Sequence, residues 1–286
     1  MVAVASLYRA SGAPYAGFGT NGRFHTAILS NPPLHAEVNV FDAALSHDAD
    51  AETRLYIAGN YSLDDAQHDY DGFVLALKAI EGVKDPNFYA GDARHVALDL
   101  GDCNVNCRDA VTAINVQANG KISMAGWSTD ENLNQQLMLG RLTIHGYPDP
   151  SFEGGGLFSP TLGSHYYLPN SSGFMIPRAI AERPNTRDLV VAMDARLDAG
   201  ANSPAFQILG QWPGNARAEI AGISFTFTSD PSVVPWAIGA ALLVDADSAM
   251  LIGTRRWSGT DDDVTLVRTV ANDTLFADMF GGPASD

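Results

Sequence analysis

The chain has 286 residues, of which 46% are apolar, and its formal net charge at pH 7 is −16. This apolar content predicts a folded globular protein, and the length allows one large domain or two ordinary ones. The acidic surface argues against nucleic acid and anionic membranes as partners, because both attract basic proteins. No run of about 18 apolar residues predicts a membrane-spanning helix, so we expect no membrane insertion.

The chain opens with an apolar segment, residues 2–10, followed by a turn that ends at "GFG" around Phe18. The segment matches the last strand and turn of the units found further along the chain, although the chain also ends with the same element at 264–282. One strand of this type is therefore surplus. We expect the N-terminal strand to pair with a sheet edge elsewhere in the chain or in a partner molecule, since an unpaired edge invites association.

Four similar hairpins follow in chain order. Each first strand has the form Ala, then Leu or Ile, three variable residues, Ala or Pro, then Asn or Asp, and these strands begin at 44, 113, 179 and 241, which are 69, 66 and 62 residues apart. Each is followed by a second apolar strand: "RLYIAGNYS" from 54, "KISMAGWST" from 121, "DLVVAMDA" from 188 and "AMLIGTRR" from 249. An apolar strand, a polar turn and a second apolar strand are typical of a β-hairpin.

Each hairpin continues into a third strand, at 72–80, 136–144, 205–212 and 263–270. In two units a turn of the form Asp-Pro-x-Phe comes next, "DPNFYAGD" at 85–92 and "DPSFEGGG" at 149–156. Pro86 and Pro150 preset the backbone angle φ of the turn, and we expect it to join the last strand of one unit to the first strand of the next. Phe88 and Phe152 are predicted to fill the seam between neighbouring units.

The repeat therefore predicts an all-β, propeller-like fold in a single domain over 1–286. Each unit has about 65 residues and four antiparallel strands, and the chain carries an extra N-terminal strand. The repeats run roughly over 19–88, 89–152, 153–222 and 223–280.

At this level of detail the chain resembles the delta-60 repeat family, whose pattern is close to "DPSFxGGG" followed by "A-L-x-x-Q-x-D/N-G-K-I-x-x-A-G". The second unit carries the likeness best, with "AINVQANGKISMAG" and then "DPSFEGGG", and the third departs most, with Met193 in place of the glycine. The resemblance implies a bacterial, propeller-like protein, often exported or at the cell surface. It implies no activity and supplies no catalytic residues.

The chain has two cysteines, Cys103 and Cys107. Their spacing allows a small loop disulfide, and with no histidine nearby they make a poor zinc site. We expect them to be bonded to each other in an exported form, which favours an extracellular, cell-surface or periplasmic location, although the chain shows no convincing signal peptide.

Acidic residues gather in the predicted loop after the second hairpin strand of each unit. Three interpretations remain open for them: solvated turns, a calcium site, or a carboxylate pair that cleaves a glycoside. The best calcium candidate is the loop "DDAQHDYDG". Its acidic residues are Asp64, Asp65, Asp69 and Asp71.

Aromatic residues accompany these acids, and an exposed ring beside Asp or Asn suits the apolar face and hydroxyls of a sugar. The candidate ligand-binding residues are Tyr61, Trp127, Trp257, Asp69, Asp130 and Asp261. Alternatively, Tyr61 and Trp127 simply pack between blades. The loops on this side of the predicted sheets are long and varied, which is where binding sites on a rigid scaffold tend to lie.

No nucleophile motif, phosphate-binding loop or metal-binding helix motif is present in the sequence. We therefore expect a non-catalytic binding or scaffold protein that recognises a glycan or a protein partner, with calcium as the one candidate cofactor. The alternative is a propeller-type glycoside hydrolase or lyase that uses the acidic loop residues. Homo-oligomerisation through a sheet edge is a further expectation.

Overall fold

The computed structural model describes most of the first two thirds of the chain and the strands of the remainder. The described residues are 1–7, 9, 11–28, 37–47, 53–64, 69–96, 108–129, 135–152, 156–158, 174–196, 205–212, 221–226, 237–244, 248–258 and 261–270. No described helix is long and apolar enough to cross a membrane.

The regular structure of the described residues is antiparallel β-sheet, with one three-residue 3-10 turn at Tyr89–Gly91. The first sheet contains β1 (Val2–Ala5) and β2 (Arg23–Thr26). The second contains β3 (Val38–His47), β4 (Thr53–Asp64), β5 (Asp69–Lys78), β6 (Val83–Lys84) and β7 (Arg94–Val96). The third contains β8 (Asp109–Val116), β9 (Ile122–Thr129), β10 (Gln135–Leu142) and β11 (Leu157–Phe158).

Two further sheets complete the described fold. The fourth contains β12 (Phe174–Glu182), β13 (Leu189–Arg196), β14 (Ala205–Trp212) and β15 (Ala221–Thr226). The fifth contains β16 (Ala237–Val244), β17 (Ser248–Ser258) and β18 (Asp261–Val270). Within each of the last four sheets the first three strands pair in chain order, as the hairpin repeats predict.

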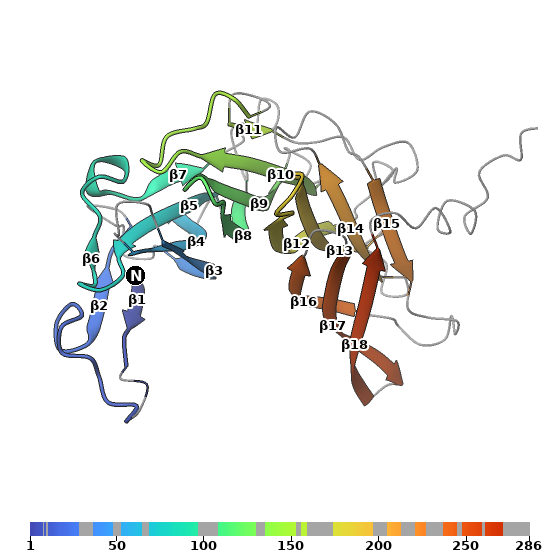
Figure 1. Ribbon diagram of the computed structural model, residues 1–286, viewed down its shortest axis with the longest axis horizontal. Coiled ribbons are helices and arrows are strands. Elements are labelled where there is room, and N and C mark those ends of the chain that lie inside the picture. The colour runs from blue at the N-terminus through green and yellow to red at the C-terminus, as the bar shows by residue number, and fades with distance from the viewer. Residues whose placement is uncertain are drawn as a thin grey trace, which may run out of the picture.

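The sheets follow one another like the blades of a propeller (Figure 1). Their first strands, β3, β8, β12 and β16, lie side by side in chain order, and the later strands of each sheet lie further out. This confirms the predicted all-β, propeller-like class. Closure of the blades into a ring stays a prediction.

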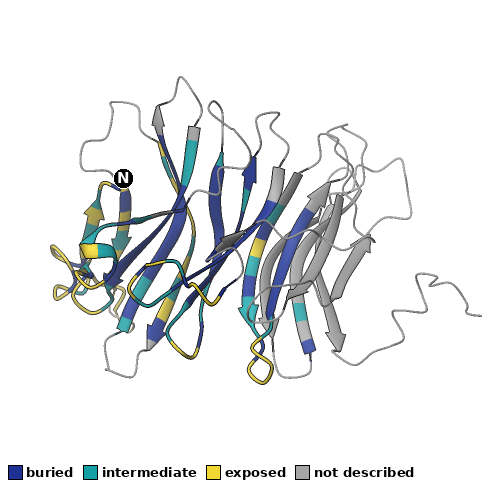
Figure 2. Cartoon of the chain, turned by 90° about the horizontal axis from the view of Figure 1, so that it is seen from above, coloured by how far each residue is buried: buried dark blue, intermediate teal, exposed yellow. Residues whose placement is uncertain are grey.

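The core consists of apolar seams between neighbouring sheets. Along β5, Phe73, Leu75 and Leu77 pack toward the first sheet, whereas Val74 and Ala76 pack toward the third. This strand is apolar on both faces because a sheet covers each face, which explains its continuous apolar sequence. Buried residues accordingly run along the strands, while exposed ones gather at the turns (Figure 2).

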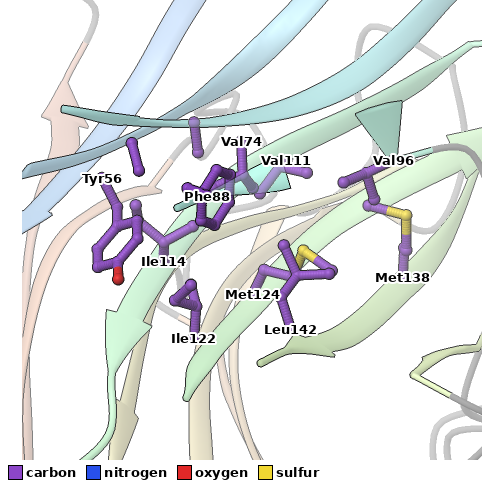
Figure 3. Close-up of a cluster of buried hydrophobic side chains, with 12 residues drawn as sticks. Tyr56, Val74, Phe88, Val96, Val111, Ile114, Ile122, Met124, Met138 and Leu142 are labelled. Carbon is purple, nitrogen blue, oxygen red and sulfur yellow. The ribbon is translucent and has the colours of Figure 1, made fainter. Parts of the chain in front are cut away.

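A buried phenylalanine lies in each of the two seams on either side of the third sheet. Phe88 lies in the seam between the second and third sheets, where its ring contacts Tyr56 with a centroid distance of 5.7 Å (Figure 3). Phe152 lies in the next seam, and Phe18 is equally buried. A methyl group at Gly82 or Gly146 would lie within 3 Å of the ring of Phe18 or Phe88, so these glycines leave room for the ring of the preceding turn. The predicted seam role of Phe88 and Phe152 is confirmed.

The connection made by the Asp-Pro-x-Phe turn differs from the prediction. The strands that follow it, β7 and β11, pair with β5 and β10, so the turn joins the third and fourth strands of one sheet. The sequence repeat is therefore displaced from the sheet by one strand. The reason is that the turn is tight enough to return the chain antiparallel to the strand it has just left.

The aspartate of each turn is buried and paired with a cation. Asp85 accepts a hydrogen bond from Arg54 Nε at 2.6 Å, and Asp149 accepts one from Arg141 Nε at 2.6 Å and one from Lys121 Nζ at 2.8 Å. Arg54 and Lys121 occupy equivalent places, immediately before the apolar part of the second strand. The turn motif and the first residue of the second strand thus form one structural unit.

A glycine in three of the four second strands, namely Gly59, Gly126 and Gly253, lies opposite a bulge in the first strand. β3, β8, β12 and β16 each carry a register shift at the same level, at Phe41, Thr112, Arg178 and Ala240. The bulge brings a carbonyl oxygen onto the opposing strand, so a Cβ at Gly59 would lie 1.9 Å from Asn39 O and one at Gly126 would lie 1.8 Å from Ala110 O. Only glycine fits there without moving the backbone.

Substitution of Asp149 should make stability depend less on pH. Burial alone would raise the pKa of Asp149, but hydrogen bonds from Lys121, Ser151 and Arg141 together hold it well below the ordinary value of 3.8. A lowered pKa stabilises the fold above the unfolded-state pKa, and this contribution is lost as the pH falls below about 4. Asp149→Asn should therefore cost more than about 2 kcal/mol of unfolding free energy at pH 7, and this cost should shrink below pH 4.

Chemical denaturation of wild type and Asp149→Asn between pH 7 and pH 3 measures this difference. Asp92→Asn is the matched control, because its exposed ion pair with Lys84 should contribute little at any pH. A difference between wild type and Asp149→Asn that stays constant down to pH 3 would contradict the prediction.

Gly126→Ala should destabilise the fold by on the order of 3 kcal/mol, because the added methyl group meets backbone atoms of Ala110 in addition to the Met138 side chain, and the backbone cannot move aside. Gly17→Ala is the control, since its methyl group meets only the ring of Tyr15 in an exposed turn. Equal midpoints of thermal unfolding for the two variants would show that the bulge tolerates a side chain.

Candidate functional site

The two ends of the sheets differ in chemistry. At one end, here called the turn end, lie the tight hairpin turns and the Asp-Pro-x-Phe turns with their buried ion pairs. At the other, here called the loop end, the first strands begin and the second strands finish. The described residues of the loop end include 37–41, 60–64, 69–72, 108–112, 127–129, 174–178 and 194–196, and in the fifth sheet 237–239 and 254–258. The repeated motifs belong to the turn end and serve packing, so the loop end is the candidate site.

In the second sheet, the loop end is tied together by hydrogen bonds between polar side chains. The hydroxyl of Tyr61 donates to Asp71 Oδ2 at 2.9 Å, and the hydroxyl of Tyr70 donates to Glu37 Oε2 at 3.0 Å. Asn39 Nδ2 donates to Asn60 Oδ1 at 3.1 Å, which links β3 to β4. These contacts fix the directions of polar groups on the strands and directly beside them.

The third sheet joins this network through Arg108. Its guanidinium carbon lies 5.9 Å from the centre of the Tyr70 ring, at the far end of a cation–π contact. Its backbone exchanges hydrogen bonds with Thr129, so the residue is held at the start of β8. The two sheets therefore present a continuous polar rim that contains two carboxylates and one arginine.

A second feature of the loop end is a position that recurs in each sheet. Asn60, Trp127 and Asp194 each follow the residue that pairs with the bulged part of the first strand, so they lie at one level of successive sheets. Asn60 and Asp194 are buried, and Trp127 is half-buried. The strand alternation places Trp127 on the same face as Ala125, toward the fourth sheet.

Arg178 adds a cation near the middle of the fold. It occupies the bulge of the innermost strand β12, and its Nε donates to the buried carboxylate of Asp194 at 2.8 Å. The side chain of Arg178 is 36% exposed, whereas that of Asp194 is 6% exposed. Asp194 therefore holds a partly exposed guanidinium in place, and such a group suits carboxylate or hydroxyl ligands.

The predicted ligand-binding residues differ in how far the structure exposes them. Tyr61 is 1% exposed and packs against Phe73 in the core, so its ring offers no platform to a ligand. Trp127 keeps part of its surface. Asp69, Trp257 and Asp261 lie in strands β5, β17 and β18, but their side chains fall outside the described part, and Asp130 lies outside it altogether.

The predicted calcium ligands Asp64, Asp69 and Asp71 lie in strands rather than in a loop. Asp64 and Asp69 oppose each other across β4 and β5, which shortens the intervening loop to 65–68, and Asp65 within it is outside the described residues. No group of three or more metal-ligating side chains occurs among the described residues. The predicted Cys103–Cys107 disulfide also lies outside the described residues.

Sequence reasoning missed Glu37, Asn39, Asn60, Arg108 and Arg178. The place directly after the shared glycine was a usable signal for Asn60, because Trp127 and Asp194 occupy the same place in their units. Arg178 gave no such signal, since the bulge that turns it toward the middle of the fold arises from strand pairing and leaves no pattern in the sequence.

Comparisons with known proteins add a distant likeness in structure. No family model matches the sequence, and no curated protein matches it. Polysaccharide lyase Uly1 aligns over 81% of this chain at 11% identity and a TM-score of 0.41. An arabinanase from Cellvibrio cellulosa, in complex with arabinohexaose, aligns over 84% at 10% identity and 0.38. A protein of unknown function from Dyadobacter fermentans aligns over 85% at 10% identity and 0.33.

The aligned region spans 45% of the lyase, 79% of the arabinanase and 79% of the Dyadobacter protein. At these identities and TM-scores, the alignments identify neither a family nor an activity for this chain.

The two tyrosine hydroxyls of the loop end should differ in their effect on stability. Tyr61→Phe removes the donor to the partly buried Asp71 and should cost about 1 kcal/mol of unfolding free energy. Tyr70→Phe removes an exposed hydrogen bond to Glu37 and should cost less than about 0.5 kcal/mol. Urea denaturation of the two variants tests this. An equal or larger cost for Tyr70→Phe would show that the outer rim, and not the core, holds this end of the sheet.

Proposed function

We propose that the chain is a non-catalytic binding protein that recognises a glycan through the loop end of its sheets. The observation that carries the proposal is the contrast between equivalent positions. Turn-end positions repeat the same packing groups, namely a phenylalanine, an aspartate and a cation. The loop-end position that follows Gly59, Gly126 and Met193 instead carries an amide, an indole and a carboxylate in Asn60, Trp127 and Asp194.

The chemistry of these groups favours a sugar. A half-buried indole on a rigid strand offers an apolar plane to the C–H face of a pyranose or furanose ring. The rim around it holds amides, carboxylates and the guanidinium of Arg178, which donate to or accept from hydroxyl groups. A pocket that combines an apolar plane with a few fixed polar groups is typical of small-ligand recognition.

The same proposal extends to the domain organisation, to further residues of the binding face and to a bound cation. We propose that the four repeats form the blades of one propeller domain, that Trp257, Asp130 and Asp261 belong to the same binding face, and that calcium binds at 64–71. The resemblance to the delta-60 repeat family supports an extracellular, cell-surface or periplasmic location. A protein partner in place of a glycan is the competing ligand class.

The hydrolase or lyase alternative has less support from the described residues. A general acid needs a raised pKa and a free oxygen. Burial raises the pKa of Asp42 on the innermost strand β3, but its two oxygens accept hydrogen bonds from the backbone amides of Ala43 and Ile114, each at 2.8 Å. Asp42 thus links neighbouring sheets, which is a structural role.

A glycan array, probed with the whole chain in the presence of calcium and again with a chelator, should identify the ligand and test the calcium site. Trp127→Ala should then weaken binding of the best glycan by about 2 kcal/mol, roughly 30-fold, because aromatic anchors carry much of the affinity of a binding face. Isothermal titration of the purified variant measures this.

Tyr147→Ala is the matched control, since Tyr147 is an exposed aromatic residue at the turn end and should leave binding unchanged. Loss of binding in Tyr147→Ala with none in Trp127→Ala would move the site to the opposite end. Binding to no glycan on the array, together with capture of a defined protein ligand that Trp127→Ala abolishes, would replace the glycan by a protein.

A further inference from the structure

We propose that the first sheet is half of a blade, and that its free edge and the neighbouring apolar surface of β3 receive a two-stranded β-hairpin from a partner polypeptide. This site shares Val40 with the loop end and otherwise lies along β1 and the outer face of β3. It rests on two independent features, one in the hydrogen bonding of β1 and one in the exposure of β3.

The β1–β2 pair reproduces the third and fourth strands of the complete sheets. Ser6 N donates to Gly22 O at 3.0 Å, as Arg141 N donates to Gly156 O at 2.8 Å in the third sheet. Tyr15 N donates to Ser6 O at 2.8 Å, as Asp149 N donates to Arg141 O at 2.9 Å. β1 therefore corresponds to β10, and β2 to β11.

In the complete sheets, the other edge of the third strand is covered by a second strand: β4 covers β5, and β9 covers β10. No described strand covers this edge of β1. Ser6 N–H points to β2, and the direction of the backbone hydrogen-bonding groups alternates along a strand. The backbone groups of Val2 and Val4 therefore also point to β2, whereas the N–H and C=O groups of Ala3 and Ala5 point to the free edge.

The exposed apolar residues of β3 also indicate that a second strand is missing from the preceding sheet. Counted from the bulge of each first strand, Val40, Ala43 and Leu45 of β3 occupy the same positions as Val111, Ile114 and Val116 of β8, respectively. The β8 residues pack against Tyr56 and Ala58 of β4, the second strand of the preceding sheet. Val111 and Ile114 are 0% and 5% exposed, while Val40 and Leu45 are 49% and 60% exposed.

The sheet that precedes β3 is the β1–β2 pair, which packs against β4 and β5, and no second strand for it occurs among the described residues. One missing element therefore accounts for both features. A second strand added to β1 would pair with Ala3 and Ala5 and would cover Val40, Ala43 and Leu45. Its own first strand would complete a four-stranded sheet, as in the third sheet.

The chemistry of the occupant follows from the repeat. It is an antiparallel hairpin with small apolar residues and a glycine opposite its bulge, because Gly59 and Gly126 are required there. It needs no cation at the start of its second strand, since Tyr15 stands where the other turns have the aspartate that Arg54 or Lys121 binds. Strand addition of this kind draws its affinity from main-chain hydrogen bonds.

A second copy of this chain is the less suitable occupant. Each described hairpin of the repeat, β3–β4, β8–β9, β12–β13 and β16–β17, is already paired to a third strand of its own sheet. A second copy would have to offer its own β1 edge instead, and such an edge would leave Val40 and Leu45 uncovered by a second strand of the repeat type.

The probe for this site is a fluorescent peptide that copies residues 108–129, the β8–β9 hairpin. Fluorescence anisotropy should show saturable binding of the peptide to the whole chain. Ala5→Pro should weaken it at least tenfold, because proline removes an N–H from the free edge while the ladder between β1 and β2 keeps its donors. Leu45→Asp, at an exposed position that tolerates a charge, should weaken it similarly.

Two altered peptides test the chemistry. The peptide with Gly126→Val should fail to bind, because its bulge cannot form, whereas the peptide with Lys121→Ala should bind like the original. Unchanged thermal unfolding of the Ala5→Pro and Leu45→Asp proteins shows that their folds are intact.

Other outcomes would overturn the proposal. Absence of peptide binding by the wild-type chain would show that the edge is already filled or does not accept a strand. Binding that survives both protein variants would place the peptide elsewhere. A dimer in light scattering that Ala5→Pro dissociates would make a second copy the occupant.

Discussion

The structure depends on one constraint, which is that the second and third sheets are apolar on both faces and so must be covered on both. Successive residues of β5 enter two different seams, Phe73 and Leu75 on one side and Val74 and Ala76 on the other. A sheet of this kind is stable only between two neighbours, because its faces cannot be solvated. The burial of Phe88 and Phe152 between sheets and the order of sheets in Figure 1 both follow from this requirement.

The same constraint separates packing from recognition. At the turn end, the seams are closed by Phe18, Phe88 and Phe152 and by the buried pairs of Asp85 and Asp149, so the sequence there is restricted to a few residue types. At the loop end, the seams are already filled below the rim. Side chains such as Trp127 and Arg178 are then free to vary between units, and that freedom is what a binding face requires. Where a neighbouring sheet is incomplete, the constraint is not met, and apolar surface on β3 stays exposed.

The third unit shows how the restrictions are linked. It has lost the Asp-Pro pair of the turn, and at the place of Arg54 and Lys121 it carries Asp188, whose carboxylate accepts from Thr186 instead. A cation left without its aspartate would be buried and unpaired, which is costly, so both members of the pair are absent together. Met193 replaces the glycine in the same unit, opposite Pro177 at the bulge of β12.

The sequence by itself determined the fold class, the hairpin repeats and the seam role of Phe88 and Phe152, because these depend on local periodicity, on turn residues and on repetition within one chain. Only the tertiary structure decided which sheet each strand joins, so that the Asp-Pro-x-Phe turn lies within a sheet, and which side chains reach the surface. Tyr61 and Trp127 look alike in sequence, one residue apart in their units, yet strand alternation buries the first and leaves the second half-exposed. Pairing register and coverage by neighbouring sheets set that difference, and both arise from contacts between segments that are distant in the chain.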